Sequence, residues 1–137
     1  MLRKLLILAR EAGVPLEAED VDIVPMLGPE FFDCPLDEFY RKLAEYEPQF
    51  IALEAELDAA DERRRFVASL RRDSAARNGY RAEIKMQRVG PDSPFYWISG
   101  TENVTVVRSE YSAPLVIKGA GEGVRLAATG IIKDILM

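Results

Sequence analysis

The side chain with the best case for proton chemistry in this 137-residue chain is Lys4. Leu2, Leu5 and Leu6 recur at helical spacing around it and predict an amphipathic helix. Lys4 would lie where the leucine face of that helix meets its polar face. A lysine held against apolar surface can titrate in a range that suits acid-base catalysis, but most such lysines simply extend their charge into water. From the residues alone, both roles stay open.

A second candidate is the run Gly119-Ala120-Gly121-Glu122-Gly123, which stands between a predicted strand and the final predicted helix. Glycines at such a junction let the backbone turn sharply, and the free N–H groups at a helix start attract anions. The spacing is G-x-G-x-G, not the G-x-G-x-x-G of dinucleotide-binding loops, and Glu122 would repel a phosphate. Spacing alone therefore favours a structural turn over a phosphate site. We expect a turn that opens the last helix, with at least one glycine at positive φ.

The composition excludes several other kinds of site. The chain has no histidine, so it holds no Ser-His or Cys-His nucleophile and lacks the most common zinc ligand. The single cysteine, Cys34, cannot close an intrachain disulfide and is expected to act as a small apolar filler. No two carboxylates stand out as an acid-base pair, and no metal site is predicted.

Length and composition predict one folded domain over residues 1–137. Hydrophobic residues make up 48% and charged residues 30% of the chain, with a mean hydropathy of -0.09. This balance is typical of globular proteins and not of disordered chains. Because no run approaches the ~18 apolar residues of a membrane span, we expect a cytoplasmic protein without a membrane partner.

The charge is unevenly distributed along the chain. The net charge is -5, yet residues 63–88 hold nine Lys and Arg against two acidic residues. A basic segment of this kind could meet phosphate, but Phe66 and Tyr80 are its only aromatic residues, and nucleic-acid surfaces usually interleave stacking partners with cations. A solvated sheet face is favoured, and no nucleic-acid partner is predicted.

The hydrophobic periodicity changes from helical to alternating and back to helical. It predicts a helix near 2–12, a short strand or extended piece at 21–24, a two-segment helical stretch over about 36–62 whose second segment starts at Pro48, strands around 66–70, 80–86, 104–107 and 115–118, and a closing helix through 128–136. This order indicates an α+β fold. We expect helices that flank a mainly antiparallel or mixed four-stranded sheet, with the terminal helix after the glycine-rich loop.

The ordered motifs also resemble a known enzyme family over essentially the whole chain. They are RKLLILAREAG, LEAEDVDIVPML, RRRFVASL, PDSPFYWISGTENVTVV, PLVIKGAGEG and ATGIIKDIL. In this order they resemble the carboxy-terminal, substrate-binding and dimerisation part of homoserine dehydrogenase, most of all the form fused to an aspartate kinase. The first motif and PLVIKGAGEG carry most of the resemblance.

The resemblance implies an oxidoreductase that interconverts L-aspartate 4-semialdehyde and L-homoserine with NAD or NADP, in threonine, methionine and isoleucine biosynthesis. Lys4 occupies the position of the family's catalytic lysine, which exchanges a proton at the substrate oxygen while hydride moves. Gly123 and Gly121 match the glycine loop that comes close to the cofactor. The family also implies a homodimer whose contact is made by the sheet of this region.

The chain departs from the family pattern in three places. The family's substrate-binding carboxylate would fall before Met1, and its nucleotide-binding half has no counterpart here. Leu126-Ala127 stand where the family usually has Val-Thr. We therefore expect that the missing half binds most of the cofactor and that this chain alone is inactive. The alternative is a non-catalytic dimerisation or regulatory module that retains the fold.

Overall fold

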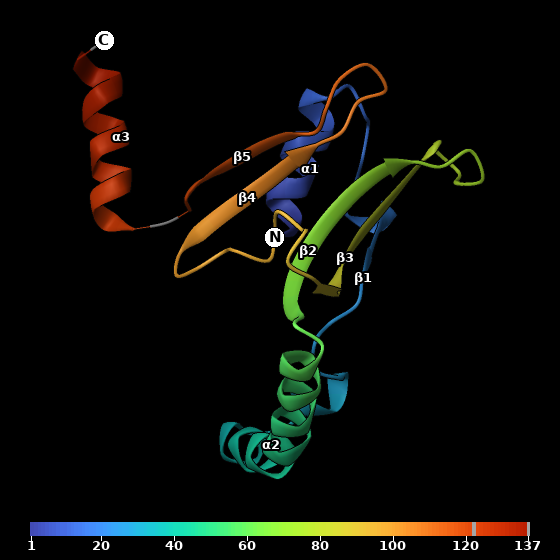
Figure 1. The fold of residues 1–137 in the computed structure, drawn as a ribbon, viewed down its shortest axis with the longest axis vertical. Coiled ribbons are helices and arrows are strands. Elements are labelled where there is room, and N and C mark those ends of the chain that lie inside the picture. Colours follow the sequence, from blue (N-terminus) through green and yellow to red (C-terminus); the bar gives the residue numbers. More distant parts are fainter. Residues whose placement is uncertain (122, 137) are drawn as a thin grey trace. The chain divides into compact units, whose positions relative to one another are not determined.

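The computed structural model describes residues 1–121 and 123–136; Glu122, Met137 and the side chain of Leu126 lie outside its description. The chain divides into two compact units, Met1–Arg88 and Val89–Met137. Figure 1 shows the helices and strands of both units. None of the described helices combines the length and the apolar composition needed to cross a membrane.

The first unit contains helices and a three-stranded sheet. Its elements are α1 (Leu2–Glu11), the 3-10 turn η1 (Ala18–Asp20), β1 (Val21–Ile23), the 3-10 turn η2 (Pro29–Phe31), α2 (Leu36–Ala59), β2 (Arg63–Arg72) and β3 (Tyr80–Val89). The strand order is β1-β3-β2, with β1 parallel to β3 and Val21 opposite Ala82. Figure 1 shows β2 and β3 running in opposite directions, so this sheet is mixed.

The core of the first unit lies between α1 and the sheet. It consists of Leu5, Ala9, Val14, Leu16, Val21, Ala82 and Ile84, and the partly buried Leu2, Leu6, Ala68, Leu70 and Tyr80 pack against it. The apolar residues of α1 share one side because their spacing follows the helical repeat of about 3.6 residues. α1 ends where Gly13 takes a φ of +78°, a left-handed conformation that favours glycine. The helix and its glycine stop are therefore as the sequence predicts.

α2 differs from the two-segment stretch that the sequence predicts. It is one continuous helix of 24 residues, and Pro48 lies inside it instead of starting a second helix. Figure 1 shows that α2 changes direction along its length. A proline removes one helical N–H donor, and its ring crowds the carbonyl group of the residue four positions earlier, here Ala44. Bending relieves this crowding without ending the helix.

The opposite face of the first unit's sheet gathers charges around Glu83. The side chain of Glu83 is 6% exposed and lies 2.5 Å from Arg81 Nε, 2.7 Å from Lys85 Nζ and 3.6 Å from Arg71 Nη2. Hydrogen bonds from Lys85 and Arg81 hold the pKa of the Glu83 carboxyl below its usual value. Part of the basic segment thus surrounds a carboxylate.

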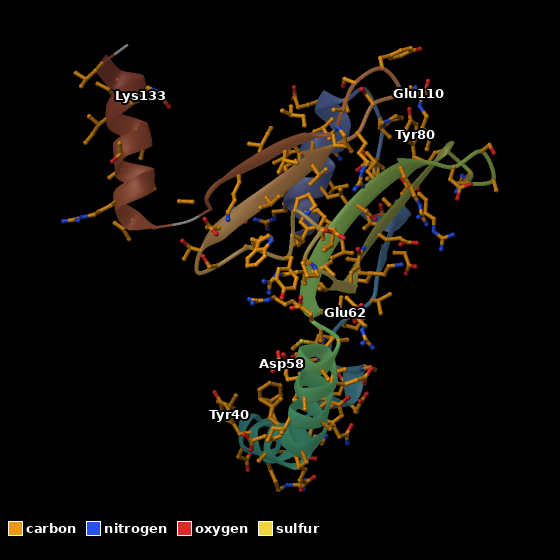
Figure 2. All side chains as sticks on the ribbon, viewed as in Figure 1. Tyr40, Asp58, Glu62, Tyr80, Glu110 and Lys133 are labelled. Atoms are coloured by element: carbon orange, nitrogen blue, oxygen red, sulfur yellow. The ribbon has the colours of Figure 1, made fainter. Side chains whose placement is uncertain are left out.

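A second charged cluster joins the end of α2 to β3. Arg88 donates hydrogen bonds to Glu56 Oε1 at 2.7 Å and to Glu62 Oε2 at 2.6 Å. Figure 2 shows Glu62 at the junction between the end of α2 and the start of β2. Arg88 therefore links β3 to the end of α2 and to the turn that follows it, which lie 26 to 32 positions earlier in the sequence.

The second unit consists of a hairpin and a helix. β4 (Glu102–Val107) pairs antiparallel with β5 (Leu115–Ala120), and α3 (Val124–Leu136) follows. The α+β class is confirmed, but the described strands form sheets of three and two instead of one sheet of four. The segment between β3 and β4 contains Pro91 and Pro94, which lack the N–H group that a continuing ladder would need. This segment separates β3 from β4 along the chain.

The charges around Glu83 predict a stability that depends on pH. Because its folded pKa is lowered, ionised Glu83 stabilises the fold at neutral pH, and this contribution falls as the pH drops below 4.5, the ordinary value, through the lowered folded pKa. Chemical unfolding measured between pH 7 and pH 3 should show a steeper loss of stability for the wild-type chain than for Glu83→Gln. Equal slopes for the two proteins would contradict the prediction.

Candidate functional site

Lys4 lies on the exposed side of α1, turned away from the core. Leu5 and Ala9 are buried, and a rotation of about 100° per residue places Lys4 between Leu8 and Glu11 on the opposite side. Leu8 is 53% exposed, and Ile7 on the same side is 60% exposed. The lysine therefore stands on the exposed side of α1 beside exposed apolar side chains, and not at the edge of the buried face as the sequence predicts.

The ammonium group of Lys4 is available for contact. Among the residues that the structure describes, no carboxylate forms an ion pair with it, whereas Arg10 of the same helix pairs with Glu17 at 2.7 Å. The exposed apolar surface around Lys4 would lose its contact with water if another molecule or segment packed there. A lysine in such a covered position could donate a proton or hydrogen bond to a substrate oxygen.

The glycine loop of the second unit connects β5 to α3. Gly123 immediately precedes the first helical residue, with a φ of +141°, and its carbonyl oxygen accepts a hydrogen bond from the Ala127 amide at 3.0 Å. An L side chain rarely adopts this φ value. The expected positive-φ glycine before the last helix is therefore confirmed, while Glu122 of the expected turn lies outside the described residues.

Gly121 is required for a different reason, which is close approach of the backbone. Its amide donates a 2.7 Å hydrogen bond to the carbonyl oxygen of Thr101. A Cβ atom at this position would overlap the Asn103 side chain and would lie 2.7 Å from the same carbonyl oxygen. The contact with a backbone atom cannot be relieved by a side-chain rotation, so residue 121 must be small.

A polar network surrounds the start of β4 and the end of β5. Oε2 of Glu102 accepts hydrogen bonds from the Ser99 amide at 2.9 Å and the Ser99 hydroxyl at 3.1 Å, and lies 3.1 Å from Lys118 Nζ. Lys118 Nζ also donates to the carbonyl oxygen of Trp97 at 2.9 Å. The backbone hydrogen bond from Ser99, together with the bond from Lys118, holds the pKa of Glu102 below its usual value.

Sequence reasoning did not identify Glu102 or Lys118. Their opposite charges are visible in the sequence, but they are 16 positions apart. The hairpin register, with Val104 opposite Lys118 and Glu102 opposite Ala120, makes them diagonal neighbours on one face. That register depends on the pairing of the strands.

The structure therefore describes the predicted site in two parts. Lys4 belongs to the first unit, whereas Gly121 and Gly123 belong to the second.

Within the part of the chain described, no group of three or more metal-ligating side chains could hold a metal ion. Cys34 is half-buried, and its Sγ contacts the carbonyl oxygen of Phe31 at 3.3 Å.

Two neighbouring glycines allow a matched test of the close approach at Gly121. Gly121→Ala should lower the free energy of unfolding by about 1–3 kcal/mol, because the added methyl group must displace a backbone contact. Gly119→Ala should change it by no more than about 0.5 kcal/mol, because a Cβ there meets no described atom within 4 Å. Urea unfolding of both variants checks this, and equal effects would show that the backbone contact does not limit residue 121.

Comparison with known proteins covers nearly the whole chain. The family profile described as homoserine dehydrogenase matches residues 1–136. A chloroplastic bifunctional aspartokinase/homoserine dehydrogenase from Zea mays is 32% identical over 98% of this chain and 14% of its own length. A homoserine dehydrogenase from Saccharomyces cerevisiae is 28% identical over 98% of this chain and 37% of its own length.

A solved structure matches this chain over the same share of its length as these relatives do. The crystal structure of a protein of unknown function from Candida auris has a TM-score of 0.75 and 26% identity, and the match covers 98% of this chain and 37% of that one. The chain thus spans between about one seventh and about two fifths of these related proteins. Because the profile match includes residues 1–136, the chain belongs to the homoserine dehydrogenase family.

Proposed function

We propose that this chain is the substrate-binding and dimerisation part of an NAD- or NADP-dependent homoserine dehydrogenase, which interconverts L-aspartate 4-semialdehyde and L-homoserine in threonine, methionine and isoleucine biosynthesis. The observation that carries the proposal is the position of Lys4. By the sequence resemblance it occupies the place of the family's catalytic lysine, and α1 presents it to the outside among exposed apolar side chains. A cytoplasmic location remains a prediction from the sequence.

The proposed role of Lys4 follows from the charge that develops during the reaction. The nicotinamide cofactor, when bound, exchanges a hydride with the substrate carbon. Reduction of the aldehyde therefore leaves negative charge on its oxygen, and the Lys4 ammonium stabilises that charge and donates a proton to it. In the opposite direction, neutral Lys4 accepts the proton from the hydroxyl group of homoserine. The burial of Leu5 and Ala9 holds the helix in the orientation that presents Lys4.

The glycine loop fits a supporting contact with the cofactor. A Cβ atom at Gly119 or Gly123 would meet no described atom within 4 Å, so a ligand can approach the backbone there. The positive φ of Gly123 sets the direction in which the chain enters α3. We assign Gly123 to this contact and Gly121 to the same loop, where its close approach to Thr101 fixes the backbone, and most of the cofactor to the nucleotide-binding half of the longer protein.

Exposed apolar side chains in the second unit support a homodimer. In β5, Leu115 and Ile117 are exposed on one face and Val116 on the other. In α3, Val124 is 89% exposed and Leu136 is 79% exposed. Apolar surface of this kind usually marks contact with another protein or domain. We assign the hairpin to the contact between subunits.

Substitution of Lys4 provides the central test in the full-length protein. Lys4→Ala should lower kcat for homoserine oxidation by about 10²–10⁴-fold, because the proton donor and acceptor is lost. Cofactor affinity, measured by fluorescence titration, should stay nearly unchanged. Arg3→Ala, which removes a neighbouring exposed cation of the same helix, serves as the matched control and should retain normal turnover.

The 137-residue chain alone should show no dehydrogenase activity in the same assay. Positioning of cofactor and substrate contributes about 7–11 kcal/mol to such reactions, and a chain without the nucleotide-binding half loses that contribution.

Two results would contradict the proposed role or the proposed function. A full-length Lys4→Ala variant that oxidises homoserine with the wild-type kcat would remove Lys4 from the mechanism. An absence of homoserine oxidation in the wild-type full-length protein would favour the non-catalytic module.

The assembly state gives a separate test. The isolated chain should sediment as a dimer or larger species at tens of micromolar, because the exposed hairpin has apolar side chains on both faces. Analytical ultracentrifugation measures this directly. Val116→Lys should shift the distribution toward monomer, and Lys133→Met, on the exposed surface of α3 in Figure 2, should not. A strictly monomeric wild-type chain would contradict the proposed subunit contact.

A further inference from the structure

Side-chain packing contributes little to the position of the glycine loop. Every residue of β5 is exposed, so the end of this strand is not held by burial in a core. The exit from β5 is instead held by its pairing with β4, which places Glu102 opposite Ala120 and Asn103 opposite Gly119. The hydrogen bond from the Gly121 amide to Thr101 extends the pairing by one residue.

The Glu102–Lys118 pair joins this exit to a loop that does have a buried anchor. Tyr96 is 5% exposed, and its ring lies 4.8 Å from that of Trp97. Lys118, two residues before the end of β5, donates to the carbonyl oxygen of Trp97. Glu102, at the start of β4, accepts both hydrogen bonds from Ser99. Contacts therefore run from buried Tyr96, through the pair, to the strand that leads into the glycine loop.

We propose that Glu102 and Lys118 are positioning residues, which hold the backbone of Gly121 in place within the glycine loop that contacts the nicotinamide cofactor. This inference rests on the function proposed above, since it assigns the glycine loop to the cofactor contact. The pair acts through the strands: Glu102 fixes the start of β4, Lys118 fixes the end of β5, and the hydrogen bond from Gly121 to Thr101 connects Gly121 to both.

The pair is polar and partly exposed, which determines how large its effect is. The side chains of Glu102 and Lys118 are 32% and 41% exposed, so water weakens their attraction. Their loss should therefore loosen the exit from β5 without unfolding the hairpin, whose backbone ladder remains. The effect should appear in cofactor affinity and in local amide exchange, and much less in overall stability.

The experiment uses the full-length protein with Glu102→Gln, Lys118→Met, the double variant and the conservative Lys118→Arg. The control is Glu45→Gln, which removes an exposed ion pair with Arg41 on α2. Cofactor Kd is measured by fluorescence titration, and kcat and KM for homoserine come from steady-state assays. Hydrogen exchange reports on the amides of residues 119–123.

Glu102→Gln and Lys118→Met should each raise the cofactor Kd by about three- to tenfold, the range expected for one partly exposed charged contact. The KM for homoserine should stay within about twofold of the wild-type value. The double variant should raise the cofactor Kd by less than the product of the two single effects, because the two residues share one ion pair. Lys118→Arg should restore affinity to within about twofold, and Glu45→Gln should leave it unchanged.

Amide exchange in residues 119–123 should become faster in Glu102→Gln and Lys118→Met and stay unchanged in Glu45→Gln. Faster exchange with an unchanged cofactor Kd would reduce the pair to a structural contact and overturn the inference. Unchanged exchange together with unchanged Kd would overturn it as well. A wild-type protein that neither binds the cofactor nor oxidises homoserine would instead overturn the proposed function, and the inference with it.

Discussion

The packing of α1 against the three-stranded sheet is the constraint on which the candidate catalytic residue depends. Leu5 and Ala9 are 6% and 0% exposed, and the pitch of the helix then determines which way every other side chain points. Lys4 is directed outward by the burial of its neighbours, without an ion pair of its own among the described residues. A substitution that loosened this core would therefore change the direction in which Lys4 points, although the lysine itself is unchanged.

The second unit uses a different kind of constraint. Its hairpin and helix leave many apolar side chains exposed, so backbone pairing and a few polar contacts hold the glycine loop. Gly121 shows the consequence, because its amide approaches Thr101 too closely to allow a side chain. Apolar surface here is available for contact between polypeptides, while polar contacts maintain local geometry.

Several cations of the basic segment form ion pairs with carboxylates in the folded chain. Residues 63–88 form a strongly basic segment in the sequence. In the structure, Arg81 and Lys85 contact the nearly buried Glu83, and Arg88 reaches Glu56 and Glu62. Arg81 and Lys85 thus neutralise a carboxylate of their own strand, whereas Arg88 joins β3 to α2 and to the turn that follows it. A charge count along the chain overstates the basic surface that remains, because ion pairs form between residues that folding brings together.

The sequence by itself determined the local elements and the candidate residues. Helical and alternating periodicity predicted α1, α3 and the strands, and the glycine-rich run predicted the positive φ before α3, since these features depend on neighbouring residues. Family motifs pointed to Lys4, Gly121 and Gly123. Only the tertiary structure decided that the strands form two sheets, that α2 continues through Pro48, and that Glu102 meets Lys118. Strand partners and register depend on contacts between distant residues, and local periodicity does not specify which strands pair.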